Sequence, residues 1–259
     1  MFTDLDGTLL DHHTYNWSPA AEALAALSRS AIPVVLVSSK TAVEMESYRS
    51  ALELNDPIVA ENGAVISVPD GYFANALPVS VPVSRATLQN AYTDIKILGD
   101  FRCEAFFELG VEGIVRETGL TAAQAQQADK RTASEPIRWR DTEVREREFV
   151  DAAATRGLRC VRGGRFLHLM GDVGKEDAVN ALLSAFAADD SSQSFMSVSL
   201  GDGPNDLGML GATDIAVVLP GKHAHAMSIT TAGTVHHAKL AGPAGWNQAI
   251  LGILETHGL

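Results

Sequence analysis

The 259-residue sequence predicts an α/β fold, in which a Rossmann-like core of parallel strands is interrupted by an inserted α+β domain. Short apolar runs alternate with helical stretches in the first third, as βαβ units require. The next segment is more charged and polar, and the α/β alternation returns after it. We therefore divide the chain into a first core part at 1–81, an α+β cap at 82–171 and a second core part at 172–259.

Continuous apolar runs mark the strands of the first third, because strands buried on both faces lack alternating polar residues. The expected strands are Phe2-Thr3, which is very short, Ile32–Val37 and Pro57–Ala60. A hairpin is expected after the third strand, with its turn at Pro69-Asp70-Gly71. This order of elements places the three strands in one parallel sheet.

Helix start signals separate these strands. Ser18 and Pro19 suit the N-cap and the first turn of one helix, and Thr41 with Glu44 forms a capping-box pair for the next. The insertion and the second core part have further helical patterns at Leu88–Ile97, Ala122–Lys130, Glu143–Thr155 and Lys175–Phe186. Their strand patterns lie at Glu135–Trp139, Leu158–Val161, Arg165–Leu169, Met196–Leu200 and Asp214–Leu219.

The composition excludes several function classes. A net charge of -12 and a pI near 5.0 remove the usual electrostatic reason for binding nucleic acid or an anionic membrane surface. Cys103 and Cys160 lack metal-ligand spacing and give no disulfide framework. No apolar run reaches eighteen residues and the amino terminus is acidic, so we expect a cytoplasmic protein without a signal peptide. Its oligomeric state cannot be predicted.

Two carboxylates separated by one residue follow the first strand, as Asp4 and Asp6 in the segment DLDGTLL. Ligands of open parallel sheets gather at the carboxyl ends of the strands, so both side chains are expected at a site. Two carboxylates in different surroundings can divide the work of nucleophile and proton carrier. The alternative for an isolated pair of this kind is a polar turn closed by glycine.

A second acidic segment, GDGPND at 201–206, follows another apolar strand and adds Asp202 and Asp206 to the same edge of the sheet. Four carboxylates at close range repel one another unless a cation lies between them. Hard oxygen ligands in this number favour magnesium. The sequence therefore predicts a Mg²⁺ site.

These motifs, together with an apolar strand that ends in serine and a lysine that opens a late helix, occur in the order typical of the haloacid dehalogenase superfamily, which the sequence resembles. The resemblance implies Asp4 as the nucleophile that forms an aspartyl phosphate and Asp6 as the general acid/base. It also implies that Asp4, Asp202 and the backbone carbonyl of Asp6 surround Mg²⁺. Asp206 then supports the metal, directly or through water.

The resemblance further implies a hydroxyl and an ammonium group for the phosphoryl oxygens. Ser39 is preferred to Ser38 for its position relative to the strand, although both serines can instead cap the helix that follows. Lys175 matches the family lysine, which neutralises phosphoryl charge and keeps Asp4 ionised. Thr8 of the first motif is assigned to substrate binding.

Other segments resemble mannosyl-3-phosphoglycerate phosphatases, which leave mannosylglycerate and phosphate. They are SSKT at 38–41 with Glu44, ENGA at 61–64, Arg131 through SEP at 134–136, GGRF at 163–166 with His168, and GDGPND at 201–206. The substrate-binding residues implied are Lys40, Asn62, Arg131, Ser134 and Arg165. For the two arginines, a solvated surface role is the open alternative. His168, the cysteines and the tryptophans are assigned to structure and packing.

The sequence thus predicts a magnesium-dependent phosphatase of a small phosphorylated sugar compound, with mannosyl-3-phosphoglycerate as the first candidate. Glucosyl-3-phosphoglycerate phosphatase, broad-specificity sugar phosphatase, phosphomutase and a non-catalytic sugar-phosphate sensor are the alternatives. Only three residues precede Asp4, fewer than is usual in the family. Either the true start lies upstream of Met1, or this edge of the sheet is weakly held.

Overall fold

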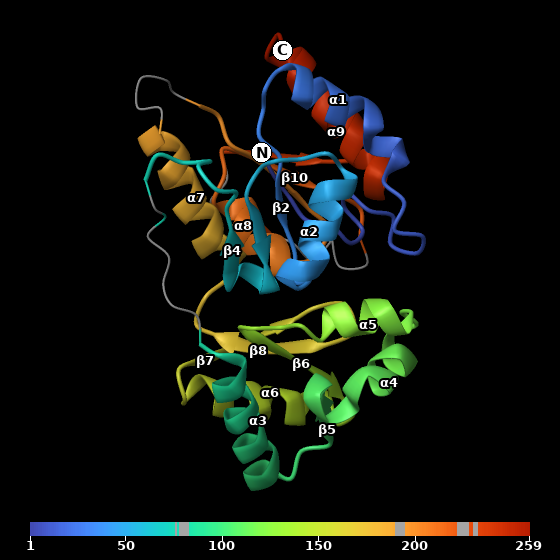
Figure 1. Cartoon of the computed structure of the whole chain (residues 1–259), viewed down its shortest axis with the longest axis vertical. Helices are drawn as coiled ribbons and strands as arrows, with labels where there is room; N and C mark the ends of the chain where they lie inside the picture. The colour runs from blue at the N-terminus through green and yellow to red at the C-terminus, as the bar shows by residue number, and fades with distance from the viewer. Residues whose placement is uncertain (76, 78–82, 190–194, 222–227, 230–232) are drawn as a thin grey trace.

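The computed structural model of the chain describes residues 1–75, 77, 83–189, 195–221, 228–229 and 233–259. These residues form two parts, a core that contains both termini and a second part below it in Figure 1. Each part has its own sheet. We call the part with the seven-stranded sheet the core, and the part with the four-stranded sheet the cap.

The core sheet is parallel except at one edge. Its order is β11-β10-β9-β1-β2-β3-β4, and only the pair β3–β4 is antiparallel. The strands are β1 (Phe2–Thr3), β2 (Val35–Val37), β3 (Ile58–Ala60), β4 (Val65–Ser67), β9 (Val198–Gly201), β10 (Ile215–Val218) and β11 (Thr234–His237). The predicted parallel core is confirmed.

Strand β1 lies in the middle of this sheet, although it has only two residues. Phe2 pairs with Val35 on one side and Ser199 on the other, and the amino group of Met1 donates to the carbonyl oxygen of Pro33 at 2.8 Å. The expectation of a weakly held sheet edge is therefore wrong. The short strand is held on both sides, and it delivers Asp4 to the centre of the sheet.

Alternate residues of the strands bury the two faces of the core sheet under different helices. One face packs against α1 (Ala21–Arg29), α2 (Ala42–Ala51) and α9 (Gly242–Thr256), and the other against α7 (Lys175–Asp189) and α8 (Leu207–Gly211). In Figure 1, α1 and α9 accordingly lie on the opposite side of the sheet from α7. Short 3₁₀ helices are η1 (Ser18–Ala20), η2 (Glu61–Gly63) and η3 (Pro204–Asp206).

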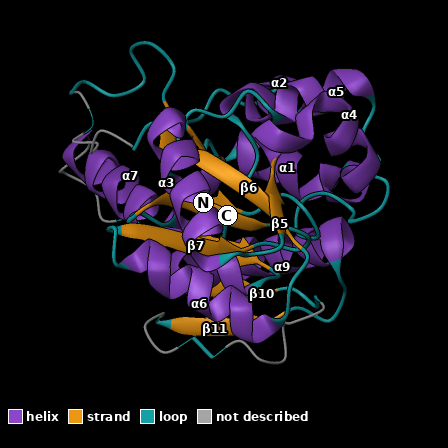
Figure 2. Ribbon diagram, turned by 90° about the horizontal axis from the view of Figure 1, so that it is seen from below, coloured by secondary structure: helices purple, strands orange, loops and turns teal. Residues whose placement is uncertain are grey.

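The cap is an antiparallel sheet covered by helices on its far face. Its order is β5-β6-β8-β7, with β5 (Cys103–Ala105), β6 (Ser134–Trp139), β7 (Leu158–Arg162) and β8 (Leu167–Gly171). Helices α3 (Arg85–Gly99) and α6 (Glu143–Ala154) pack on the face that looks away from the core, and they lie in front when the molecule is seen from below (Figure 2). Helices α4 (Phe106–Thr118) and α5 (Ala122–Ala128) complete the cap.

Three expectations about local structure need correction. The chain reverses at η2, directly after β3, so the hairpin turn is not at Pro69-Asp70-Gly71. Two consecutive residues, Glu61 and Asn62, adopt left-handed backbone angles there, a conformation that is uncommon outside glycine and cannot be read from a strand pattern. The N-cap expected at Ser18 is occupied by Trp17, without a side-chain bond. Strand β8 begins at Leu167 rather than Arg165.

The predicted start of the cap, between residues 81 and 82, lies outside the described residues, whereas the predicted end coincides with the last residue of β8, Gly171. The division at these positions stays a prediction. Among the described residues, none of the helices combines the length and apolar character needed to span a lipid bilayer.

Gly63 is tightly constrained where η2 meets the start of α7. Its φ is +103°, and a Cβ atom added to it would lie 2.0 Å from the carbonyl oxygen of Gly174. This contact is between two backbones, so neither side can give way. It fixes the start of α7, and with it Lys175.

We therefore expect Gly63→Ala to lower the free energy of unfolding by at least about 2 kcal/mol, because it adds a backbone clash to left-handed strain. Thermal unfolding measures the change. Gly71→Ala is the matched control, since Gly71 also has a positive φ, +72°, but has no atom within 4 Å of an added Cβ. The control should cost only about 1 kcal/mol. Equal losses for both variants would contradict the close packing.

Candidate active site

The ends of three core strands and the start of α7 meet at one edge of the sheet. Asp4 follows β1, Asp202 and Asp206 follow β9, and Ser38 follows β2. Strands β9, β1 and β2 are neighbours, so side chains at their carboxyl ends converge on one point. The structure therefore brings together segments that are up to about two hundred residues apart in the sequence.

Lys175 joins these segments. Its side chain is 1% exposed, and its Nζ donates to Oδ1 of Asp4 at 2.6 Å and to Oδ1 of Asp206 at 2.7 Å. A third bond, at 3.4 Å, reaches the carbonyl oxygen of Val37 at the end of β2. Burial alone would lower the pKa of Lys175, but the charges of Asp206 and Asp4 outweigh it and raise the pKa above its usual value. The lysine is therefore charged at every physiological pH.

Three carboxylates, of which those of Asp4 and Asp206 are buried and that of Asp202 is half-buried, face a single ammonium group. Oxygen atoms of Asp4, Asp202 and Asp206 all lie within 4.8 Å of one another. Burial and the charge of Asp206 raise the pKa of Asp4 well above its usual range, against the opposing effect of Lys175. The same causes raise the pKa of Asp202 to about 7. The site thus carries an excess of negative charge that a cation would relieve.

The donor set fits a hard divalent cation such as Mg²⁺, since it consists of carboxylate oxygens. Asp4 and Asp202 are the better candidates for direct ligands. Both oxygens of Asp206 are already engaged, one by Lys175 and the other by the backbone N–H groups of Asp202 and Gly203 at 3.1 and 3.0 Å. Asp206 is therefore placed to orient the loop and the lysine.

Thr8 and Asp6 lie beside this centre, but neither is part of the acidic cluster. The hydroxyl of Thr8 donates to Oδ1 of Asp202 at 3.4 Å, so it contacts a predicted metal ligand. Oδ2 of Asp6 pairs with Nζ of Lys40 at 2.8 Å, whereas Oδ1 of Asp6 is buried without a hydrogen-bond partner among the described residues. The ammonium of Lys40 also lies over the rings of Tyr15 and Tyr48, at 5.2 and 5.8 Å from their centres.

The two serines after β2 have different surroundings. Ser38 is 1% exposed, and its Oγ accepts a bond from the N–H of Lys40 at 3.3 Å. Ser39 is half-buried, and its carbonyl oxygen accepts a bond from Arg131 of the cap at 3.0 Å. Thr41, not a serine, caps α2 through a capping box with Glu44, as predicted.

The cap is docked on the core through one buried carboxylate, that of Glu61. It accepts bonds from the N–H and the hydroxyl of Thr132, from the N–H of Ala133, and from the hydroxyl of Ser134 at 2.6 Å. The hydroxyl of Thr41 adds a bond to the carbonyl oxygen of Gln127 at 3.0 Å. Ser134 is thus occupied by the contact between cap and core, and Glu61 is a residue whose role sequence reasoning missed.

Polar groups without partners lie next to this contact. Asn62 is 2% exposed, and neither of its side-chain polar atoms has a hydrogen-bond partner among the described residues. Arg131 is also buried, and burial lowers its pKa. Its Nη1 binds Ser39 and Ser134, but its Nε has no partner among the same residues. Buried polar groups in native proteins are nearly always paired, so these atoms mark a place where a ligand can bind.

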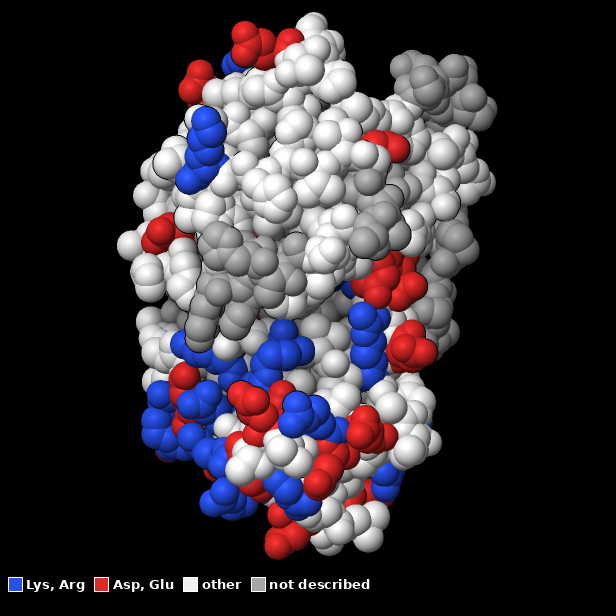
Figure 3. Space-filling model, turned by 180° about the vertical axis from the view of Figure 1, so that it is seen from behind, with Lys and Arg blue, Asp and Glu red and all other residues white. Residues whose placement is uncertain are grey.

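Arg165 differs from Arg131. It is exposed, and its Nη1 donates to the carbonyl oxygen of Thr118 within the cap at 2.7 Å. Charged side chains gather over the cap in Figure 3, and basic ones also line its boundary with the core. Arg165 is one of many cap charges, whereas Arg131 is buried at the contact with the core.

A second support of the site comes from the buried Trp246 of α9. Its ring N–H donates to Oγ1 of Thr3 at 2.9 Å, and Thr3 in turn donates to the carbonyl oxygen of Asp4 at 2.8 Å. The assignment of this tryptophan to packing alone is therefore incomplete. The sequence gives little indication of this hydrogen bond, because 243 residues separate Trp246 from Thr3.

The sequence of this chain is similar to those of known proteins. Residues 1–143 match the family of haloacid dehalogenase-like hydrolases. The chain belongs to this family. A glucosyl-3-phosphoglycerate/mannosyl-3-phosphoglycerate phosphatase of Methanococcoides burtonii is 33% identical to this haloacid dehalogenase-like hydrolase, over 98% of the chain and 96% of the relative. The predictions of the family and of a hydrolase are thereby confirmed.

Solved structures share the fold of this chain. A protein of Thermoplasma acidophilum superposes with a TM-score of 0.68 at 17% identity, over 99% of this chain and 96% of its own. A sugar phosphatase of subclass IIB superposes with a TM-score of 0.66 at 17% identity, over 99% and 98%. At this level of identity the likeness concerns the fold alone, which confirms the predicted fold class.

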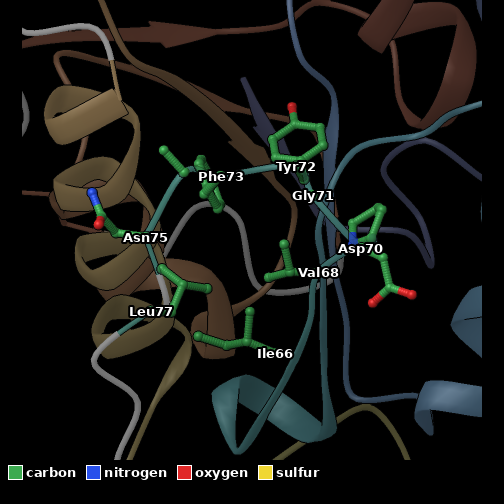
Figure 4. A pocket seen from close by; sticks show the side chains of 10 residues that line it. Ile66, Val68, Asp70, Gly71, Tyr72, Phe73, Asn75 and Leu77 are labelled. Atoms are coloured by element: carbon green, nitrogen blue, oxygen red, sulfur yellow. The ribbon is translucent and has the colours of Figure 1, made fainter.

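A separate pocket of about 340 Å³ lies beside β4 (Figure 4), and none of the three aspartates of the acidic cluster lines it. Ile66, Val68 and Leu77 face one another on one side of it, and Phe73 packs edge-to-face on Phe186 of α7. None of the predicted site residues lines it. We therefore place the active site at the acidic cluster.

The raised pKa of Asp202 predicts a pH-dependent response to Mg²⁺. The folded, metal-free protein retains a proton on Asp202 between its unfolded value of 3.8 and about 7. This group's contribution to stability therefore falls as the pH rises through that window. Mg²⁺ competes with the same proton, so its stabilising effect should grow as the pH rises past about 7.

Thermal unfolding with and without Mg²⁺, at about pH 5.5 and about pH 8, measures this response. At 100 times the Kd the stabilisation is about 2.7 kcal/mol. Asp202→Asn should abolish most of the rise in Tm, whereas Asp70→Asn, at an exposed loop position, should leave it intact. An equal rise in Tm at both pH values would contradict the role of Asp202.

Proposed function

We propose that this hydrolase is a magnesium-dependent phosphatase that acts on a small phosphorylated sugar compound through an aspartyl-phosphate intermediate. The observation that carries the proposal is the bond from Lys175 to Asp4. A buried carboxylate among other carboxylates is a poor nucleophile when protonated, and the ammonium group favours its ionised form. Lys175 thus opposes the burial and the neighbouring charges that raise the pKa of Asp4, and a bound cation would act in the same direction.

The residues divide the reaction between them. Asp4 attacks phosphorus in line, and Lys175 stabilises the charge of the phosphoryl oxygens. Asp6 protonates the leaving alkoxide and then takes a proton from the water that hydrolyses the intermediate. The unpaired Oδ1 of Asp6 supports this role, because it is free to bind the leaving oxygen. Its other oxygen stays with Lys40, which orients the carboxylate.

Asp4, Asp202 and the backbone carbonyl of Asp6 would hold Mg²⁺. Asp206 would support them through its bonds to Lys175 and to the loop that carries Asp202. When bound, the ion would neutralise carboxylate and phosphoryl charge as a Lewis acid. The hydroxyl of Ser39 remains the predicted donor to a phosphoryl oxygen, and the hydroxyl of Ser38, at the very end of β2, is the alternative.

The cap supplies contacts for the rest of the substrate. Asn62 and Arg131 carry unpaired polar atoms where the two parts meet, and Arg131 lacks an ion pair among the described residues. A substrate carboxylate would give this guanidinium the partner it lacks. Glycosyl-3-phosphoglycerates carry such a group beside the phosphate, and the relative from Methanococcoides burtonii is named for both the glucosyl and the mannosyl compound. We therefore propose both as substrates.

A phosphomutase of the same superfamily is the second candidate, since the same core residues can return a phosphoryl group to the substrate. The buried contact between cap and core does not separate the two reactions. Product analysis does, because a phosphatase releases inorganic phosphate whereas a mutase yields an isomeric sugar phosphate.

Asp4→Asn should lower the rate of phosphate release by about 10³-fold or more, because it removes the nucleophile. Phosphate release from mannosyl-3-phosphoglycerate, with Mg²⁺ present, measures the loss. Mass spectrometry must exclude deamidation back to Asp4. Near wild-type release by the intact variant would refute the covalent mechanism.

Arg131→Met should raise the KM for a glycosyl-3-phosphoglycerate by about 10- to 100-fold, the effect of losing a hydrogen bond to a charged group. The KM for p-nitrophenyl phosphate, which lacks a carboxylate, should change less. Arg165→Met is the matched control, and its exposure predicts a smaller effect. If the KM values for both substrates rise by the same factor in the Arg131 variant, the arginine serves only to dock the cap.

A further inference from the structure

His168 lies on the face of the cap sheet that looks toward the core. Its neighbours in β8, Leu167 and Leu169, belong to the apolar cluster beneath α3 and α6. Side chains alternate between the faces of a sheet, so His168 points the other way, toward the core. In Figure 1 this face of the cap sheet lies directly below the core.

The strand register places His168 next to the buried polar contact between cap and core. His168 pairs with Pro136 of β6, and Met170 pairs with Ser134 two residues away on the same face. Ser134 is bound by Arg131 and donates to Glu61. His168 therefore lies on the same face of the cap sheet as Ser134, which contacts Glu61 of the core.

The imidazole is buried, neutral and incompletely bonded. His168 is 5% exposed, and its Nδ1 has no hydrogen-bond partner among the described residues. Burial, together with the charges of Arg131, Arg162 and Lys175, lowers its pKa to about 3. A purely structural histidine would have both nitrogens satisfied, because an unpaired buried polar atom destabilises a fold.

We propose that Nδ1 of His168 forms a hydrogen bond with a sugar hydroxyl of the substrate, which makes His168 a specificity residue. This inference rests on the proposed function. It assigns recognition of the substrate to two side chains, the guanidinium of Arg131 and the imidazole of His168. A guanidinium favours a negative charge, whereas a neutral imidazole can donate to or accept from an uncharged hydroxyl. Arg131 would thus select the acid group, and His168 the sugar.

The test is the ratio of kcat/KM for a sugar phosphate to kcat/KM for p-nitrophenyl phosphate, which has no sugar hydroxyl. The sugar phosphate is whichever of mannosyl-3-phosphoglycerate, glucosyl-3-phosphoglycerate and glucose 6-phosphate the wild type hydrolyses best. His168→Leu should lower this ratio by about 3- to 10-fold, the loss of one neutral hydrogen bond. His168→Asn, whose amide can replace Nδ1, should restore part of it.

Two controls separate this role from a structural one. His236→Leu changes an exposed histidine of the edge strand β11 and should leave the ratio as it is. The Tm of His168→Leu should not fall, since the leucine removes an unpaired polar atom. An unchanged ratio, or equal losses on both substrates with a lower Tm, would overturn the inference.

The same measurements keep the two proposals apart. Failure of the wild type to release phosphate from either glycosyl-3-phosphoglycerate would refute the proposed substrates, while the ratio on glucose 6-phosphate still tests His168. Activity of the wild type on the glycosyl substrates, with no change of the ratio in His168→Leu, would refute the role of His168 alone.

Discussion

The ammonium group of Lys175 is the interaction on which the rest of the site depends. It lies between Asp4 and Asp206, which are about two hundred residues apart in the sequence, and it reaches the end of β2 as well. Without it, the mutual repulsion of the three carboxylates, two of them buried, would either protonate them or separate the strands. The same ammonium group that holds the strand ends together also favours the ionised form of Asp4, against the burial and the neighbouring carboxylates that raise the pKa of this group. The contacts of Lys175 with Asp4 and Asp206 therefore bear both on the packing of the strand ends and on the ionisation of Asp4.

The contact of the cap with the core obeys a similar constraint. Glu61 is fully buried, and all the hydrogen-bond partners that its carboxylate has among the described residues belong to the cap. Separation of the two parts would expose this carboxylate to water, which compensates for the lost bonds, so opening need not be costly. Asn62 follows Glu61 directly, so its unpaired side-chain atoms lie next to this contact.

The fold and the centre of the site could be predicted because their signals are local. The strand ends that carry Asp4 and Asp202, and the capping box of Thr41, are legible in stretches of a few residues. Glu61 and His168 could not be assigned, since their roles depend on partners about 70 residues away or on which face of the cap sheet meets the core. Helix α4 was missed for another reason. Its N-cap is Ala105, without a side-chain bond, and Gly110 interrupts it with a left-handed conformation.

The central position of β1 has a consequence for the order in which the chain acquires its structure. Phe2 needs Val35 on one side and Ser199 on the other, so the middle of the core sheet remains open until most of the protein has been synthesised. The strands of the cap, in contrast, all lie between Cys103 and Gly171 and pair with one another. Contacts at short sequence separation form faster than distant ones. The cap can therefore mature on the ribosome as an independent unit while the first βαβ segment waits for its last partner.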